Sequence, residues 1–134
     1  MTMEKPDFSK YPALDEHFNG RKDQYILDEN NKPVLASLME WAEFFEGGKN
    51  RIVKQETVDG YWISTVFIGI TMNFYSRNDE NFKPAIFETM IFRGQGGESL
   101  DYMDRAATWD EALECHAKAI EFVKAGCPGE EDDS

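Results

Sequence analysis

Two long apolar segments place the strongest limits on what this chain can fold into. The first, YWISTVFIGITMNF, covers residues 61–74, and the second, AIFETMIFR, covers residues 85–93. Both are rich in β-branched and aromatic residues, which is typical of β-strands, and apolar residues on both faces of the first segment indicate a central strand. Glu88 lies in the middle of the second segment. The question for function is whether this carboxylate is a reagent or a polar group that the fold satisfies.

Turn signals on either side of these segments predict an antiparallel meander. Asp59-Gly60 favours a two-residue hairpin, because both central positions of a type I′ turn need positive φ, so residues 51–58 should pair with residues 61–72. The run Gly94-Gln95-Gly96-Gly97 predicts another turn, followed by a weaker strand near residues 100–105. This run lacks the Lys-Ser/Thr pair of a phosphate-binding loop.

Two helices are predicted outside the meander, each opening on a capping box. The pairs are Ser37 with Glu40 and Thr108 with Glu111, and apolar residues recur at helical spacing after each pair. An Asx-rich turn at residues 28–33 predicts a hairpin before the first helix. The sequence therefore predicts an α+β two-layer sandwich, in which an antiparallel sheet of four to five strands, N-terminal hairpin included, packs with two α-helices.

The 134 residues are enough for one hydrophobic core. Prolines and polar residues predict a flexible N-terminal arm at 1–23, and the periodic segments place a single α+β domain at 24–126. Residues 127–134 are expected to form an acidic disordered tail.

The formal net charge of −12 limits the partners of this chain. Such a field repels phosphate backbones and anionic membranes, so we expect no direct nucleic-acid binding and no membrane association. The sequence shows no long apolar span and no apolar export signal. Cys115 and Cys127 are too far apart along the chain for a disulfide unless the tail folds back, and two free thiols favour the cytoplasm.

Glu88 and His116 form the most suggestive polar pair. Strand parity places Glu88 with Ile86, Met90 and Phe92, and His116 lies in the apolar stripe of the last helix. If the helix packs on that face of the strand, the two side chains can meet. A carboxylate beside an imidazole can orient a general base or supply half of a metal site. We expect instead a buried polar pair with a structural role, because the sequence places no nucleophile near it.

Metal and catalytic motifs are not found in the sequence. Adjacent residues such as Cys115 and His116 point about 100° apart on a helix, and Cys127 and His17 complete no zinc spacing. Neither G-x-S-x-G nor H-E-x-x-H occurs. We therefore expect no catalytic residues, no metal and no cofactor, and hence a protein that is not an enzyme.

The polar segment 73–84 is the predicted binding loop. Phe74, Tyr75, Arg77 and Phe82 give it the composition favoured at protein interfaces. The alternative is that its aromatic side chains fold back and cover the end of the sheet.

Several separated motifs resemble a family of small phage and prophage proteins of unassigned function. These are YILDENNKPVLASLMEWAEFFE, RIVKQETVDGYWISTVFIGITMNF, AIFETMIF and ATWDEALECHAKAI, which cover roughly residues 24–124. The resemblance implies a phage setting and no particular chemistry. Where members of the family commonly have Asp-His after the long strand, this chain has Thr71-Met72.

Three functions remain open from the sequence. The leading hypothesis is a small, acidic, non-catalytic phage accessory protein that binds a host or phage protein in the host cytoplasm, with a role in modulating host defence. The second is a DNA mimic that inhibits a nucleic-acid enzyme, for which Glu40, Glu43 and Glu46 supply an acidic row. The third is a protein that binds a small ligand such as a nucleotide, or an enzyme, with a pocket between sheet and helices. A homodimer through a strand edge is compatible with all three.

Overall fold

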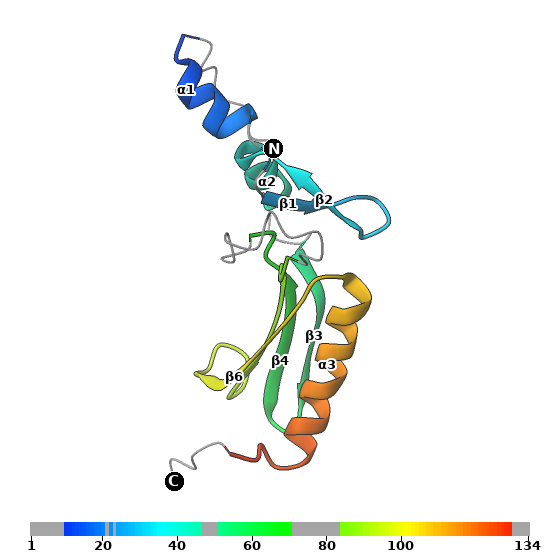
Figure 1. The fold of residues 1–134 in the computed structure, drawn as a ribbon. Coiled ribbons are helices and arrows are strands. Elements are labelled where there is room, and N and C mark those ends of the chain that lie inside the picture. The colour runs from blue at the N-terminus through cyan, green and yellow to red at the C-terminus, as the bar shows by residue number, and fades with distance from the viewer. Residues whose placement is uncertain (1–9, 21, 23, 47–50, 71–83, 130–134) are drawn as a thin grey trace.

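The computed structural model describes residues 10–20, 22, 24–46, 51–70 and 84–129. In chain order the elements are α1 (Pro12–Asp15), the π-helical turn η1 (Glu16–Gly20), β1 (Gln24–Leu27), β2 (Pro33–Ala36), α2 (Leu38–Phe44), β3 (Ile52–Val58), β4 (Tyr61–Phe67), β5 (Phe87–Phe92), β6 (Ser99–Ala106) and α3 (Trp109–Lys124). Figure 1 shows α3 lying along the larger sheet, with the β1–β2 hairpin and α2 gathered at one end of the molecule. The predicted α+β class is confirmed.

The larger sheet is the predicted antiparallel meander, with strand order β3-β4-β5-β6. Asp59 and Gly60 both have positive φ, of 49° and 87°, as the predicted hairpin turn requires. β4 ends at Phe67, so Ile68, Gly69 and Ile70 of the predicted strand 61–72 lie outside it. The strand stops because the chain turns near Gly69, whose φ is 69°.

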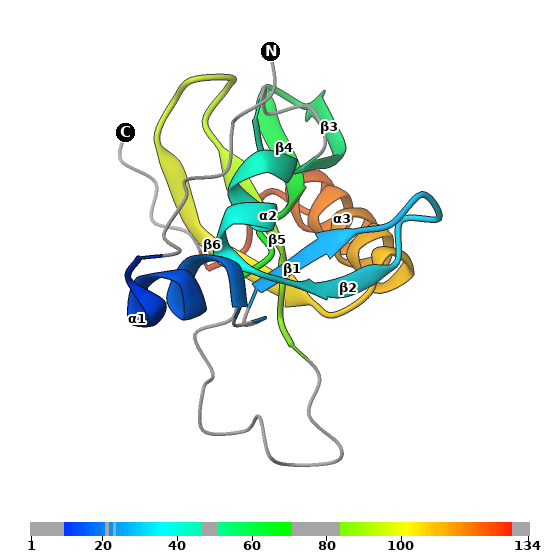
Figure 2. The ribbon, with the colours of Figure 1, turned by 90° about the horizontal axis from the view of Figure 1, so that it is seen from above.

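One face of this sheet is buried under α3, so that helix and sheet form the two layers seen in Figure 2. The strand residues that face the helix alternate along β4 and β5, and all are buried: Ile63, Thr65, Phe67, Phe87, Thr89 and Ile91. From the helix, Ala112, Ala119 and Val123 pack among them. His116 of the predicted apolar stripe is buried, whereas Leu113, one turn earlier and also apolar, is 39% exposed. The small side chains of Ala112 and Ala119 let the helix lie closer to the sheet than leucine side chains would.

The β1–β2 hairpin forms a separate two-stranded sheet, which corrects the expectation that it extends the meander. Two hydrogen bonds join this part of the chain to the end of β4. The backbone N–H of Tyr25 donates to the carbonyl of Gly69 at 2.8 Å, and Trp41 Nε1 donates to the carbonyl of Ile68 at 3.1 Å. A Cβ on Gly69 would lie 2.5 Å from the Tyr25 carbonyl oxygen and 2.6 Å from Trp41 Nε1. Glycine is therefore required where the two sheets meet.

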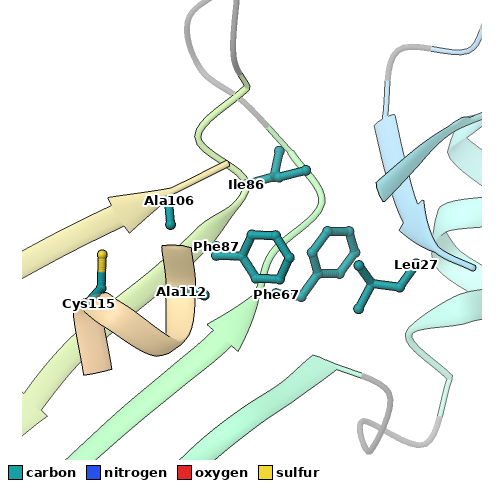
Figure 3. Packing of buried hydrophobic residues seen from close by; sticks show 7 residues of the cluster. All are labelled: Leu27, Phe67, Ile86, Phe87, Ala106, Ala112 and Cys115. Atoms are coloured by element: carbon teal, nitrogen blue, oxygen red, sulfur yellow. The ribbon is translucent and has the colours of Figure 1, made fainter. Parts of the chain in front are cut away.

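One hydrophobic cluster spans both sheets and the start of α3. Figure 3 shows Leu27 of β1 beside Phe67, with Phe87 next to it and Ala112 of α3 beyond. The remaining members of the cluster are Ile86, Ala106 and Cys115. Because strands from both sheets supply its side chains, the hairpin and the meander share one core.

The two ends of the chain differ in part from the predicted arm and tail. Pro12–Asp15 and Glu16–Gly20 are helical rather than irregular, and Pro12 stands at the start of α1, where its missing N–H costs no hydrogen bond. Cys127 is only 7% exposed and packs in the core, so the tail cannot begin at this residue.

Candidate functional site

A cleft lies between the turn of the β1–β2 hairpin and the start of α3. Its volume is about 570 Å³, within the range of roughly 300–1,000 Å³ that is usual for small-molecule sites. Tyr25 and Trp109 supply aromatic walls, and Pro33 and Pro84 supply rigid apolar ones. The other lining residues are Asn30, Asn31, Lys32, Ala107, Thr108 and Asp110.

The polar side of the cleft is held in place by the hairpin turn. The Asp28 carboxylate accepts hydrogen bonds from the backbone N–H groups of Asn30 at 2.8 Å and Lys32 at 2.9 Å. Asn31 adopts φ of 61°, a conformation that asparagine tolerates better than most residues. The sequence therefore fixes the backbone of this turn locally and leaves the side chains of Asn30 and Lys32 exposed.

The opposite side of the cleft is the capped start of α3. Thr108 Oγ1 accepts a hydrogen bond from the backbone N–H of Glu111 at 3.1 Å. The Glu111 carboxylate turns back and accepts from the N–H of Ala107 at 3.2 Å, one residue before the position that a capping box requires. The other predicted capping box is complete, because Ser37 and Glu40 exchange both hydrogen bonds.

The aromatic walls are anchored in the core and only partly covered. Trp109 meets Phe87 edge to face, with ring centroids 6.3 Å apart. Tyr25 packs against the cluster of Figure 3. Both side chains are half-buried, so they present fixed apolar surface to the cleft.

A second notable group is a polar network buried between α3 and the sheet. His116 is 1% exposed; its Nδ1 lies 2.7 Å from Thr65 Oγ1, and its Nε2 lies 2.7 Å from Glu56 Oε2. Thr65 Oγ1 also lies 2.8 Å from Thr89 Oγ1. With a proton on Nε2, the imidazole donates to Glu56 and accepts from Thr65, which accepts from Thr89 in turn. Every member of the network then has a partner.

The charge of Glu56 is stabilised at the edge of this network. The hydrogen bond from His116 lowers the pKa of the Glu56 carboxyl, against a smaller opposing effect of burial, and Lys54 at 3.5 Å lowers it further. Glu56 is part-exposed, with 33% of its side-chain surface accessible. One end of the network therefore reaches solvent, and the other end lies in the core.

The carboxylate–imidazole–hydroxyl order matches that of a nucleophilic triad, but the burial does not. The hydroxyl would have to reach a substrate, and Thr65 is fully buried with its Oγ1 also bonded to Thr89. Neither Thr65 nor His116 lines the cleft. The arrangement instead ties α3 to three strands of the sheet, as a satisfied buried network does.

The predicted pairing of Glu88 with His116 was wrong. Glu88 points to the opposite face of β5 and forms an ion pair with Arg105 at 3.1 Å. The reason is that α3 packs on the face of Phe87 and Thr89, and side chains alternate along a strand. His116 instead forms a hydrogen bond with Glu56. The signal for this lay in Thr65 and Thr89, which are polar residues at buried positions of two apolar strands.

The outer face of the meander is a third feature, built from strand pairing in regular rows. One row joins Thr57, Trp62, Phe92 and Ser99, the next joins Gln55, Ser64, Met90 and Met103, and a third joins Val66, Glu88 and Arg105. Among the described elements, no helix packs on this face (Figure 1). Met103 is 56% exposed, and a shallow depression of about 160 Å³ lies over the centre of the face.

The predicted binding-loop residues Phe74, Tyr75, Arg77 and Phe82 lie outside the described residues, so their role stays a prediction. The residues of the cleft were missed. Both the Asx-rich turn and the capped helix were predicted, but nothing in the sequence indicates that they approach each other.

Cysteine and metal chemistry receive no support from the described residues. Cys115 and Cys127 are buried and free, and burial raises the pKa of the Cys115 thiol to about 11. Within residues 10–46, 51–70 and 84–129, apart from the gaps noted above, no three acidic, histidine or cysteine side chains form a group that would hold a metal ion. No described helix combines the length and apolar character needed to cross a membrane.

Comparison of the chain with protein-family models, with curated proteins and with solved structures finds no match.

Proposed function

We propose that this protein is a non-catalytic binding protein that docks a basic protein partner on the outer face of the β3–β6 sheet. The observation that carries the proposal is the row pattern of that face. Trp62, Phe92, Met90 and Met103 come together there, and Trp, Phe and Met are enriched at protein interfaces.

The charge on this face supports docking of a protein. Glu88 and Arg105 neutralise one another within it, and Arg51 lies at the depression. The face is therefore close to neutral on a chain whose net charge is −12. Charged side chains are depleted at the centres of interfaces, whereas the surrounding field steers partners of opposite sign.

The resemblance to small phage proteins sets the biological context of the proposal. It favours a phage setting, in which the protein would bind a host or phage protein in the host cytoplasm and modulate host defence. The two free, buried cysteines are compatible with that reducing compartment.

The DNA-mimic alternative is less well supported by the described residues. α2 ends at Phe44, so Glu46 falls outside the helix on which an ordered acidic row was expected. Glu40 caps that helix and so faces its own backbone. A homodimer through a strand edge is also part of the proposal. It would use β3 or β6, the edge strands of the four-stranded sheet.

The proposal is tested by capture from a bacterial lysate with a matched pair of variants. Met103→Lys places a charge on the outer face, and Leu113→Lys places the same charge on the exposed side of α3; both side chains are exposed, so neither variant should unfold. We expect basic proteins that the wild type retains to be lost with Met103→Lys and kept with Leu113→Lys. Retention that is unchanged by Met103→Lys, or an absence of retained protein, would contradict the proposal.

A further inference from the structure

We propose that the cleft between the hairpin turn and α3 is a binding site for an uncharged nucleoside. This site lies away from the outer face of the sheet, because its walls come from β1, the hairpin turn and the start of α3. The inference is therefore independent of the proposed docking of a protein.

The size and walls of the cleft fit a planar ring. A volume of about 570 Å³ accommodates a base and a sugar. Tyr25 and Trp109 are both anchored in the core, so they offer rigid aromatic surface. Stacking of a base on such a side chain contributes roughly 1–3 kcal/mol and does not depend on charge.

The rim of the cleft offers both donors and acceptors for the edge of a base or for sugar hydroxyls. Asn30 and Asn31 each carry an amide that donates and accepts, Lys32 donates, and Asp110 accepts. The turn that carries the two asparagines is held by Asp28, so its backbone conformation is set before a ligand binds. A neutral ligand with mixed polarity matches this set better than an ion of either sign.

Phosphate groups are disfavoured at the same place. The first turn of α3 carries Asp110 and Glu111, and the Glu111 carboxylate already accepts the N–H of Ala107. The Thr108 hydroxyl already accepts the hydrogen bond from the backbone N–H of Glu111. Among the described lining residues, Lys32 is the one cation, and Asp110 offsets it. A nucleotide would therefore bring negative charge next to the Asp110 carboxylate of the cleft and the neighbouring Glu111.

Titration calorimetry with adenosine, guanosine, cytidine and uridine tests the inference, with AMP and a proline-rich peptide as competing ligands. We expect at least one nucleoside to bind with a Kd below about 1 mM and to raise the melting temperature by mass action. AMP should bind adenosine's site more weakly than adenosine does. Binding of none of the four nucleosides, tighter binding of AMP, or tighter binding of the peptide would overturn the inference.

Two variants locate the bound nucleoside, one on the exposed rim of the cleft and one in its aromatic wall. Asn30→Ala changes an exposed side chain whose backbone N–H keeps its bond to Asp28, and it should weaken binding about five- to tenfold. Trp109→Leu should abolish binding. Trp62→Phe, on the outer face of the sheet, is the matched aromatic control and should leave the affinity unchanged. An affinity that both Asn30→Ala and Trp109→Leu leave intact would place the ligand elsewhere and reject the site.

Discussion

Gly69 is the residue at which the two sheets touch, and its lack of a side chain is a structural requirement. It combines φ of 69° with a backbone neighbour, the Tyr25 carbonyl, at 2.5 Å from where a Cβ would stand. A backbone atom cannot move aside as the end of a flexible side chain can. Both the conformation and the contact therefore exclude any larger residue.

Gly69→Ala should lower the free energy of unfolding by about 2 to 4 kcal/mol, from backbone strain and overpacking together. Urea denaturation followed by circular dichroism measures the change. Gly60→Ala is the matched control, because Gly60 also has positive φ but nothing lies within 4 Å of the point where its Cβ would stand. Equal losses from the two substitutions would show that the contact with Tyr25 and Trp41 is unimportant.

His116 shows at the same scale how a buried polar side chain stabilises this fold. Its hydrogen bond lowers the pKa of Glu56 in the folded state, whereas the unfolded chain keeps the ordinary value near 4.5. A lowered folded-state pKa means that the unfolded chain binds the proton more readily. The interaction therefore stabilises the protein above about pH 4.5, and this contribution is lost as the pH falls through the lower pKa of the folded state.

Glu56→Gln should accordingly destabilise the protein at pH 6, and the difference from the wild type should shrink as the pH is lowered towards 3. Urea denaturation at a series of pH values gives the two stability curves. Glu114→Gln, which changes an exposed carboxylate on α3, controls for the loss of one negative charge. A gap between Glu56→Gln and the wild type that stays constant over this range would refute the linkage.

At the scale of elements, the first turn of α3 stabilises the helix and also supplies one wall of the cleft. Thr108 is the N-cap, and its hydroxyl accepts the N–H of Glu111 at 3.1 Å. Thr108→Ala should cost about 1 kcal/mol of stability. Thr108→Ser keeps the hydroxyl and should stay within a few tenths of a kcal/mol of the wild type. If chemical denaturation finds the two variants equally stable, the cap contributes nothing measurable.

Local signals predicted the elements well, because their causes lie within a few residues. Asp59-Gly60 turned the chain as expected, and Ser37 with Glu40 formed the full capping box. What could not be predicted was the face on which each element packs. The apolar pattern of β5 is strong on both faces, so parity alone did not show that α3 covers Phe87 and leaves Glu88 outside.

The candidate site was hidden for a related reason. The cleft forms where an N-terminal turn meets a helix almost 80 residues later in the chain, as the numbers of Asn31 and Trp109 show. Such an approach is a product of tertiary packing and leaves no local pattern. The buried Thr65 and Thr89 were the exception, since polar residues inside apolar strands do indicate a network before its members are known.

At the scale of the whole molecule, a continuous run of aromatic contacts joins the hairpin end to the helix-covered sheet. Phe45 of the α2 end stacks on Phe67 with centroids 5.8 Å apart, Phe67 lies 5.1 Å from Phe87, and Phe87 meets Trp109 of α3. Trp41 begins the run at 4.9 Å from Phe45. α2 is therefore joined to the main sheet by aromatic contacts, and Leu27 of β1 packs in the same cluster.

This packing predicts that the molecule unfolds in one cooperative step, and Phe67 at the centre of the run provides the test. Phe67→Leu should lower stability by about 1 to 2 kcal/mol, since the ring is fully buried. The loss of stability should affect the hairpin with α2 and the meander together, because side chains of both pack against the Phe67 ring. Hydrogen exchange on β1 and on β5 should show the same loss of protection. Weaker protection of β1 with β5 unchanged would mean that the hairpin and α2 unfold locally while the meander stays folded. The cleft, whose walls come from the hairpin and from α3, would then be disrupted for part of the time.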